Sequence, residues 1–199
     1  MLGASGEVRR FSEPAVAPGV KRTETWDGLT GGGKPVPDGS YRVLVAPAGG
    51  GEQEAGKVSL LGHYFPVRGP HGTRGAVGAF HAPRNGGRIH GGFDVTGRCG
   101  TPLAAVRTGT IVRKGYDPVL YGNYILLKGL GENRSYFYAH MVKPSSYRRG
   151  EHVQTAAIVG NIGQTGDAAG TPCHLHFEIH VKGRRINPEP SLRAWDRVS

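Results

Sequence analysis

Residues 173 to 180 alternate strictly between two kinds of side chain, and this alternation constrains the fold more than any other feature of the sequence. The apolar members are Cys173, Leu175, Phe177 and Ile179, and the titratable members are His174, His176, Glu178 and His180. Because successive side chains of a strand point to opposite faces, a period of two predicts a half-buried β-strand. We expect the apolar set to face a core and the titratable set to face a cleft or solvent.

The titratable face of this strand has two interpretations. A strand at a surface needs only polar residues on its outer face, and Lys, Thr or Ser would serve as well. Imidazoles separated by one residue are also the arrangement of metal ligands and of proton-transfer groups. The segment alone does not decide between these interpretations.

The C-terminal part of the sequence is a succession of short strand-like segments. They are bounded by Gly, Asn, Asp or Pro and comprise residues 108–115, 123–129, 135–141, 156–163 and 174–181. Residues 129–135 have the character of a hairpin loop. The 34 Gly and 14 Pro approach the composition of a disordered chain, but here the glycines punctuate apolar runs, as in a turn-rich β protein. With no long amphipathic helix evident, we predict an all-β fold of antiparallel strands.

The N-terminal part, residues 1–56, differs in character from residues 57–199. Turn signals surround one predicted strand, residues 40–46, and the Gly-rich residues 46–56 are typical of a linker. Residues 26–45 resemble the last strands of the immunoglobulin-like module of flagellar hook-capping proteins and bacterial surface proteins. The resemblance covers about half of such a module, so we expect a partial β segment followed by the main domain.

The charge of the chain is concentrated in the second part. Residues 1–56 carry six Lys/Arg and seven Asp/Glu, a net charge of −1, whereas residues 57–199 carry 19 and eight, a net charge of +11. A basic domain favours a polyanionic partner, such as nucleic acid, anionic lipid or an anionic cell wall. Because no basic helix or familiar nucleic-acid-binding fold accompanies the charge, we do not expect nucleic acid as the partner.

Targeting and membrane signals are scarce. No run approaches the ~18 apolar residues of a membrane helix, so we expect no membrane span. Residues 1–14 lack an apolar segment of signal-peptide length. We therefore expect either a mature fragment or export by a signal outside this sequence.

A second group of candidate ligands lies upstream, where His90 and Asp94 are separated by four positions. Gly91 and Gly92 between them argue against a helix and favour a loop that can bend. Zinc accepts imidazole nitrogen and carboxylate oxygen at about 2 Å, and catalytic sites use three protein ligands with one open position. His90, Asp94 and one histidine of the 174/176 pair would form such a site.

Two further imidazoles could then move protons. One is the unused histidine of the pair, and the other is His140 in the segment YFYAHM. Tyr136, Tyr138 and His140 alternate, so we expect them to share one face of a strand. Beside an open zinc position, one imidazole can take a proton from an attacking water, and the other can stabilise an oxyanion or protonate a leaving amine.

The motifs HGGFD, YFYAH and HLHFE, in this order, resemble the lysostaphin-like zinc metallopeptidases. The similarity extends over residues 78–190 and includes the strand-and-glycine framework between the motifs. It implies that His90, Asp94 and His176 bind one zinc ion and that His140 and His174 are the two catalytic histidines. It also implies a core of two antiparallel sheets meeting at a groove.

The resemblance predicts a secreted zinc endopeptidase that hydrolyses amide bonds in peptidoglycan stem peptides or cross-bridges. We expect an extracellular, periplasmic or cell-wall location, because the net positive charge suits an anionic wall. We also expect a monomer. One alternative is a non-catalytic member of the family that binds the wall or activates another hydrolase. A third possibility is a zinc-dependent adhesion or assembly module, suggested by the immunoglobulin-like segment.

The chain departs from the family pattern at Cys173, which stands where proline is common. The only other cysteine, Cys99, lies five residues after Asp94. Because alternation points Cys173 away from the zinc side, a Cys99–Cys173 disulfide would tie the Asp94 segment to the histidine strand from behind. Such a bridge would stabilise the fold by about 4 kcal/mol in the chain-entropy model. The alternative is two buried free thiols.

The remaining polar residues receive simpler expectations. We expect Glu178 to orient a neighbour by a hydrogen bond rather than to act as a base. We place His180 at a solvated surface, and expect surface or loop positions for His63, His71, His81 and His152. Tyr136 and Tyr138 could line a substrate groove, although aromatic residues are ordinary strand formers. Arg84 could meet an anionic group of a substrate.

Overall fold

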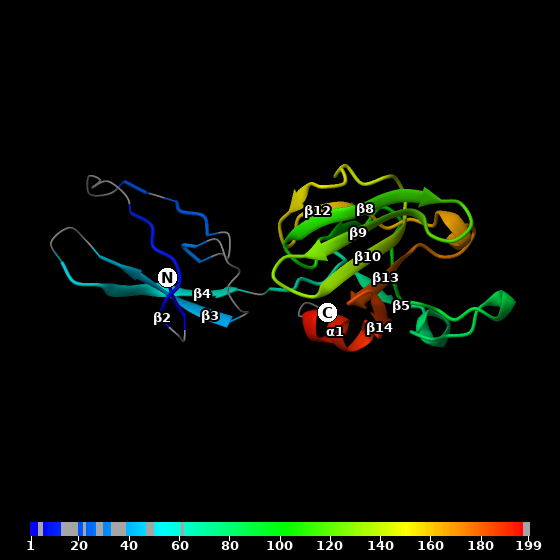
Figure 1. Ribbon diagram of the computed structural model, residues 1–199, viewed down its shortest axis with the longest axis horizontal. Helices are drawn as coiled ribbons and strands as arrows, with labels where there is room; N and C mark the ends of the chain where they lie inside the picture. Colours follow the sequence, from blue (N-terminus) through cyan, green and yellow to red (C-terminus); the bar gives the residue numbers. More distant parts are fainter. Residues whose placement is uncertain are drawn as a thin grey trace. The chain divides into compact units, whose positions relative to one another are not determined.

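The computed structural model divides the chain into two compact units, Met1–Gly62 and His63–Ser199 (Figure 1). The residues that the structure describes are 1–3, 6–12, 20–21, 23–26, 30–32, 39–46, 50–60 and 62–196. The site of interest lies entirely within the second unit.

The first unit contains a four-stranded antiparallel sheet in the order β2-β1-β3-β4. Its strands are β1 (Leu2–Gly3), β2 (Gly6–Glu7), β3 (Gly39–Val45) and β4 (Gln53–Leu60).

The strand predicted at 40–46 is therefore present as β3. The linker predicted at 46–56 is wrong at its C-terminal end, because residues 53–56 belong to β4. Residues 53–56 form a strand because they pair with the backbone of β3, and this pairing is not visible in the sequence of the Gly-rich segment. The immunoglobulin-like assignment stays a prediction.

The second unit is built on one large antiparallel sheet in the order β11-β8-β9-β10-β13-β6-β5, with β14 paired to β13. Its strands are β5 (His71–Thr73), β6 (Phe93–Gly97), β8 (Gly109–Asp117), β9 (Gly122–Gly129), β10 (Arg134–Met141), β11 (His152–Val153), β13 (His174–Val181) and β14 (Arg184–Ile186). Figure 1 shows β8, β9, β10 and β13 side by side. The predicted β-rich, antiparallel fold is confirmed, and β13 has the bounds of the strand-like segment predicted at 174–181.

Shorter elements complete the second unit. A two-stranded sheet pairs β7 (Pro102–Ala104) with β12 (Ile158–Asn161). Three 3₁₀ turns, Gly75–Gly78, Asn85–Gly87 and Gly166–Ala168, interrupt the loops, and the helix α1 (Glu189–Trp195) closes the unit. Among the described residues, no helix has the length and apolar character needed to cross a membrane.

The apolar face of β13 forms the centre of the core. Leu175, Phe177 and Ile179 are fully buried, and Cys173 is buried as well. They pack with apolar residues of β6, β8, β9, β10 and α1 in one cluster. The period-two prediction for this face is therefore confirmed. The opposite face of β13 is also largely withdrawn from solvent, because His174, His176 and Glu178 line a pocket rather than an open surface.

The strand β10 does not keep the alternation that its sequence suggests. Tyr136 and Tyr138 lie opposite Ile179 and Phe177 of β13 and are fully buried in the core. The ladder between β10 and β9 then shifts register between Tyr138 and Met141, and His140 has φ 62°. A bulge of this kind re-aims a side chain. The expectation that both tyrosines and His140 share a face is therefore wrong. Of the two interpretations of the tyrosines, the ordinary strand former agrees with their burial in the core.

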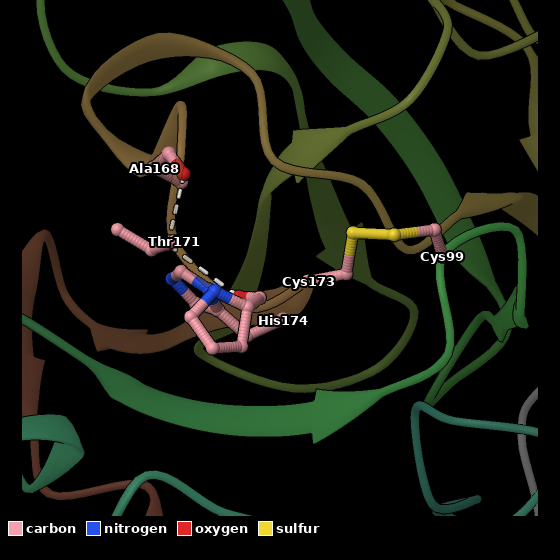
Figure 2. Close-up of a disulfide and its surroundings, with 6 residues drawn as sticks. Cys99, Ala168, Thr171, Cys173 and His174 are labelled. Atoms are coloured by element: carbon pink, nitrogen blue, oxygen red, sulfur yellow. Dashed lines mark hydrogen bonds between the residues drawn. A yellow bond between two sulfur atoms is a disulfide. The ribbon is translucent and has the colours of Figure 1, made fainter.

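A disulfide joins Cys99 to Cys173, as predicted from their positions. Figure 2 shows the sulfur bridge extending from Cys173 away from the imidazole of the next residue, His174. The bridge thus connects the segment that follows β6 to the beginning of β13 on the side opposite the pocket. The alternative of two free thiols is excluded for this structure.

Candidate metal centre and its pocket

Asp94 and His176 are direct cross-strand partners in the pairing of β6 with β13. Side chains opposite each other in a ladder project to the same face, and here Nδ1 of His176 lies 3.1 Å from Oδ1 of Asp94. Gly92 makes this approach possible. A Cβ atom at Gly92 would lie 2.4 Å from the carbonyl oxygen of Phe177 and 2.8 Å from the ring of His176.

His90 reaches the same point from the loop before β6. Its Nε2 lies 2.8 Å from Nδ1 of His176 and 3.0 Å from Oδ1 of Asp94. Its other nitrogen, Nδ1, lies 2.8 Å from the carbonyl oxygen of Ala79. A carbonyl can only accept, so Nδ1 of His90 carries the proton and Nε2 is left as a bare acceptor.

The same argument fixes the tautomer of His176. Its Nε2 lies 3.1 Å from Oε1 of Glu178, and a carboxylate accepts, so Nδ1 of His176 is bare when the ring is neutral. Three acceptor atoms, from His90, Asp94 and His176, therefore converge in a buried position. Acceptors at mutual distances near 3 Å repel one another unless a proton or a metal ion lies between them, and such distances suit a metal ion at about 2 Å from each. The residues fit a metal ion.

His140 and His174 face the same space from two other segments, with ring centroids 4.9 Å apart. Nδ1 of His140 donates to the carbonyl of Thr165 (2.8 Å), and Nδ1 of His174 donates to the carbonyl of Pro172 (2.9 Å). Each ring therefore keeps a bare Nε2. Backbone carbonyls orient the rings of His90, His140 and His174, and Glu178 orients the ring of His176.

Burial and neighbouring charges shift the pKa values of these groups. Burial, aided by the neighbouring imidazoles, lowers the pKa of His140 to about 3, and burial also lowers the pKa of His174. Burial opposes ionisation of Asp94, but its close contacts with His176 and His90 outweigh burial and hold the pKa of Asp94 well below its usual range. His140 and His174 are therefore neutral proton acceptors at neutral pH, beside a carboxylate that stays ionised.

Glu178 orients the ring of His176 by a hydrogen bond, as the sequence led us to expect. Its other oxygen, Oε2, accepts hydrogen bonds from His180 and from Nε of Arg185. Burial disfavours ionisation of Glu178, but the histidine hydrogen bonds prevail and lower its pKa to about 2. The expectation of a solvated His180 is wrong, because its side chain is 20% exposed and contacts Glu178. Arg185 was not foreseen, because only the hairpin of β13 with β14 brings it to Glu178.

Two guanidinium groups contact the outer oxygen of Asp94. Nη1 of Arg74 and Nη2 of Arg84 each lie 3.3 Å from Oδ2. Nη1 of Arg74 also lies 3.2 Å from the bare Nε2 of His174. Arg84 was a candidate from the sequence, whereas Arg74 was missed. The pairing of β5 with β6 places Arg74 beside Asp94, and no local sequence motif predicts that pairing.

These groups line one pocket of 580 Å³. Its charged lining consists of Arg74, Arg84, Arg88, Arg185, Asp94, Asp167 and Glu178. His90, His140, His174 and His176 line it as well, so all five residues singled out in the sequence meet in one cavity. The pocket is large enough for a few residues of a peptide chain.

The other histidines lie away from this pocket. His81 and His152 are exposed, as expected. His63 and His71 are not simple surface residues. His63 stacks on Trp195 and hydrogen-bonds Glu132, while His71 lies 3.1 Å from Asp196. These contacts connect the beginning of the second unit to its C-terminal segment and to the loop before β10.

The fold is antiparallel β, and three residues of metal-ligating types converge at one pocket. Residues 88–188 match the model of peptidase family M23, and the chain belongs to this family. The resemblance to lysostaphin-like peptidases is thereby confirmed.

Individual relatives agree with this assignment. The chain is 30% identical over 143 residues to the DD-carboxypeptidase/endopeptidase Mpg of Neisseria meningitidis, covering 68% of this chain and 30% of that protein. It is 27% identical to the L-Ala–D-Glu endopeptidase of Bacillus subtilis, covering 71% of this chain and 46% of that protein. The catalytic domain of lysostaphin from Staphylococcus simulans superposes with a TM-score of 0.52 at 29% identity, covering 62% of this chain and 92% of that domain. The chain thus spans less than half the length of the two curated relatives.

Proposed function

We propose that the second unit is a zinc endopeptidase that hydrolyses amide bonds of peptidoglycan. The observation that carries this proposal is the convergence of three bare acceptor atoms, from His90, Asp94 and His176, on the floor of an open pocket. Two imidazoles and one carboxylate are a ligand set that suits Zn²⁺ and leaves a position open. The chemistry that zinc supplies in such a site is Lewis-acid polarisation of a carbonyl and acidification of a water molecule.

The residues around the proposed ligands have complementary roles. His140 and His174 each present a bare Nε2 to the pocket, so either ring can accept the proton of an attacking water. The same ring, once protonated, can donate to the leaving amine, whereas the other ring can hydrogen-bond the developing oxyanion only when its own Nε2 is protonated. Glu178 holds the ring of His176, and the buried carboxylate of Asp94 keeps one negative charge at the centre.

The substrate class rests on charge and on the relatives. The net charge of +11 on residues 57–199 suits an anionic wall polymer. The names of two relatives specify bonds that involve D-amino acids, which are characteristic of peptidoglycan stem peptides. We therefore place the protein outside the cytoplasm, where a disulfide between Cys99 and Cys173 can form and persist. The monomeric state stays a prediction.

The experiment that tests this proposal compares metal-free and zinc-reconstituted protein on purified peptidoglycan. New free amino groups are measured over time, with Asp94→Asn as the variant and Arg149→Gln, an exposed position outside the pocket, as the control. We expect release only with zinc, and only from the wild type and the control. Zinc binding at about one ion per chain without any amine release would instead favour a wall-binding, non-catalytic role.

A further inference from the structure

The lining of the pocket carries more positive charge than its acidic residues balance. Four arginines line it, Arg74, Arg84, Arg88 and Arg185, against three carboxylates, those of Asp94, Asp167 and Glu178. The lining therefore has a net charge of +1, and a divalent ion on the floor raises it to +3. An enclosed concentration of one sign of charge attracts a group of the opposite sign.

Arg74 and Arg84 are only partly satisfied by their contacts with Asp94. Both guanidinium groups share the single oxygen Oδ2, at 3.3 Å each, whereas good charge-assisted hydrogen bonds to a carboxylate measure about 2.7–2.9 Å. A single short hydrogen bond from one of the two guanidinium groups would be enough to orient the carboxylate of Asp94. Two long contacts to one oxygen leave both groups free to bind a second acceptor.

Both side chains also keep unused donors. Arg84 donates through Nη1 to the carbonyl of Val77 and through Nη2 to Asp94. Arg74 uses Nη1 alone, and within the described part of the chain its Nε and Nη2 have no hydrogen-bond partner. Their side chains are 23% and 25% exposed, and both line the pocket. A planar guanidinium with two unused N–H groups matches a carboxylate bidentately.

We propose that Arg74 and Arg84 bind a carboxylate of the substrate peptide, next to the scissile bond, and so select acidic stem peptides over amidated or glycine-only ones. This inference rests on the proposed function and names the substrate class of the same site. Arg74 contacts both Asp94 and His174, so a carboxylate held there lies beside the reacting amide. The recognition needs no movement of β6 or β13, because both arginines already point at the site.

The test uses two synthetic stem peptides that are identical except for a carboxylate or a carboxamide on the residue beside the cleaved bond. Binding to the zinc-loaded protein is measured by calorimetry, and kcat and KM are measured separately. The variants are Arg84→Gln, Arg74→Gln and Arg84→Lys, with Arg149→Gln as the exposed control. Zinc content is measured for each variant, so that a disturbed Asp94 is recognised.

We expect the wild type and Arg149→Gln to bind the carboxylate peptide at least about tenfold more tightly, the usual worth of a charge-assisted hydrogen bond. Arg84→Gln and Arg74→Gln should bring this ratio close to one, chiefly through KM, while zinc content stays unchanged. Arg84→Lys should retain part of the preference, because an ammonium keeps the charge but not the bidentate fork.

Two results would overturn the inference. One is equal binding of both peptides by the wild type. The other is an equal loss of binding or rate for both peptides in the arginine variants, together with zinc loss, which would make them positioning residues for Asp94. Failure of the proposed function is distinguishable, because a protein that cleaves neither peptide still reports the carboxylate preference through binding alone.

Discussion

Asp94 and His176 face each other across the pairing of β6 with β13, with Oδ1 and Nδ1 3.1 Å apart. This relationship fixes two of the three proposed zinc ligands on rigid neighbouring strands, and only His90 comes from a loop. A site assembled on paired strands is held more precisely than one assembled from loops.

Replacing Asp94 by Asn tests the ligand set. The amide has the shape of the carboxylate but lacks its charge, so the site loses its only anionic ligand. We expect zinc content, measured by elemental analysis after dialysis, to fall from about one ion per chain to near zero, with amine release lost in parallel. Full zinc retention in a folded Asp94→Asn protein would contradict the assignment.

Replacing His140 by Asn tests proton transfer separately from metal binding. Asn tolerates the positive φ of this position, so the bulge in β10 can persist. We expect kcat to fall by about 10²-fold or more, because a general acid–base group is lost, with zinc content unchanged. Loss of zinc together with activity would instead make His140 part of the metal-binding set.

Gly92→Ala tests the close approach of β6 to β13. The added methyl would press on the carbonyl of Phe177 and on the ring of His176, so we expect weaker zinc binding and reduced stability. Gly72→Ala is the matched control, because its methyl meets only the side-chain hydroxyl of Thr96, at 3.1 Å. Equal zinc affinity in both variants, measured by competition with a chelator, would refute this steric explanation.

The Cys99–Cys173 disulfide should stabilise the second unit substantially. Replacing both cysteines by Ser is expected to lower the free energy of unfolding by about 4 kcal/mol in the chain-entropy model, measured by urea denaturation without reductant. Reductant should lower the stability of the wild type and leave the double variant unchanged. Titration of two free thiols in the denatured, unreduced wild type would contradict the bridge.

Glu132 should contribute a pH-dependent part of the stability. Burial raises its pKa, but hydrogen bonds from His63 and Tyr136, with the charge of Arg107, prevail and lower it. A carboxyl whose pKa is lowered by folding stabilises the fold above its unfolded pKa, and this stabilisation is lost as pH falls through the folded value. We expect the wild type to lose about 1 kcal/mol more than Glu132→Gln between pH 6 and pH 3. Parallel pH curves for both proteins would argue against this role.

The sequence predicted the parts of the site that short motifs carry. The alternation in 174–181 gave the bounds of β13 and its buried face, and the three motifs selected five residues that meet in one pocket. The bounds and the buried face of β13 were predictable because strand periodicity is a local property, whereas the roles of the five residues rest on the family resemblance and stay predictions.

The parts that the sequence could not give depend on tertiary pairing. The direction of His140 follows from a register shift against β9, which strict alternation does not contain. Arg74 and Arg185 arrive through the pairings of β5 and β14. The backbone carbonyls that fix the imidazole tautomers have no side-chain signature at all. Residues 53–56 form a strand through their pairing with residues 43–45 of β3.

The most direct test of the whole account is mass spectrometry of fragments released from purified peptidoglycans of different cross-link types. The zinc-loaded wild type is compared with His176→Ala and with the chelated wild type. We predict new peptide amino termini from the zinc-loaded wild type alone, at one bond type that the fragment masses identify. The same fragments from His176→Ala, or none from a wild type that holds zinc, would contradict a zinc endopeptidase.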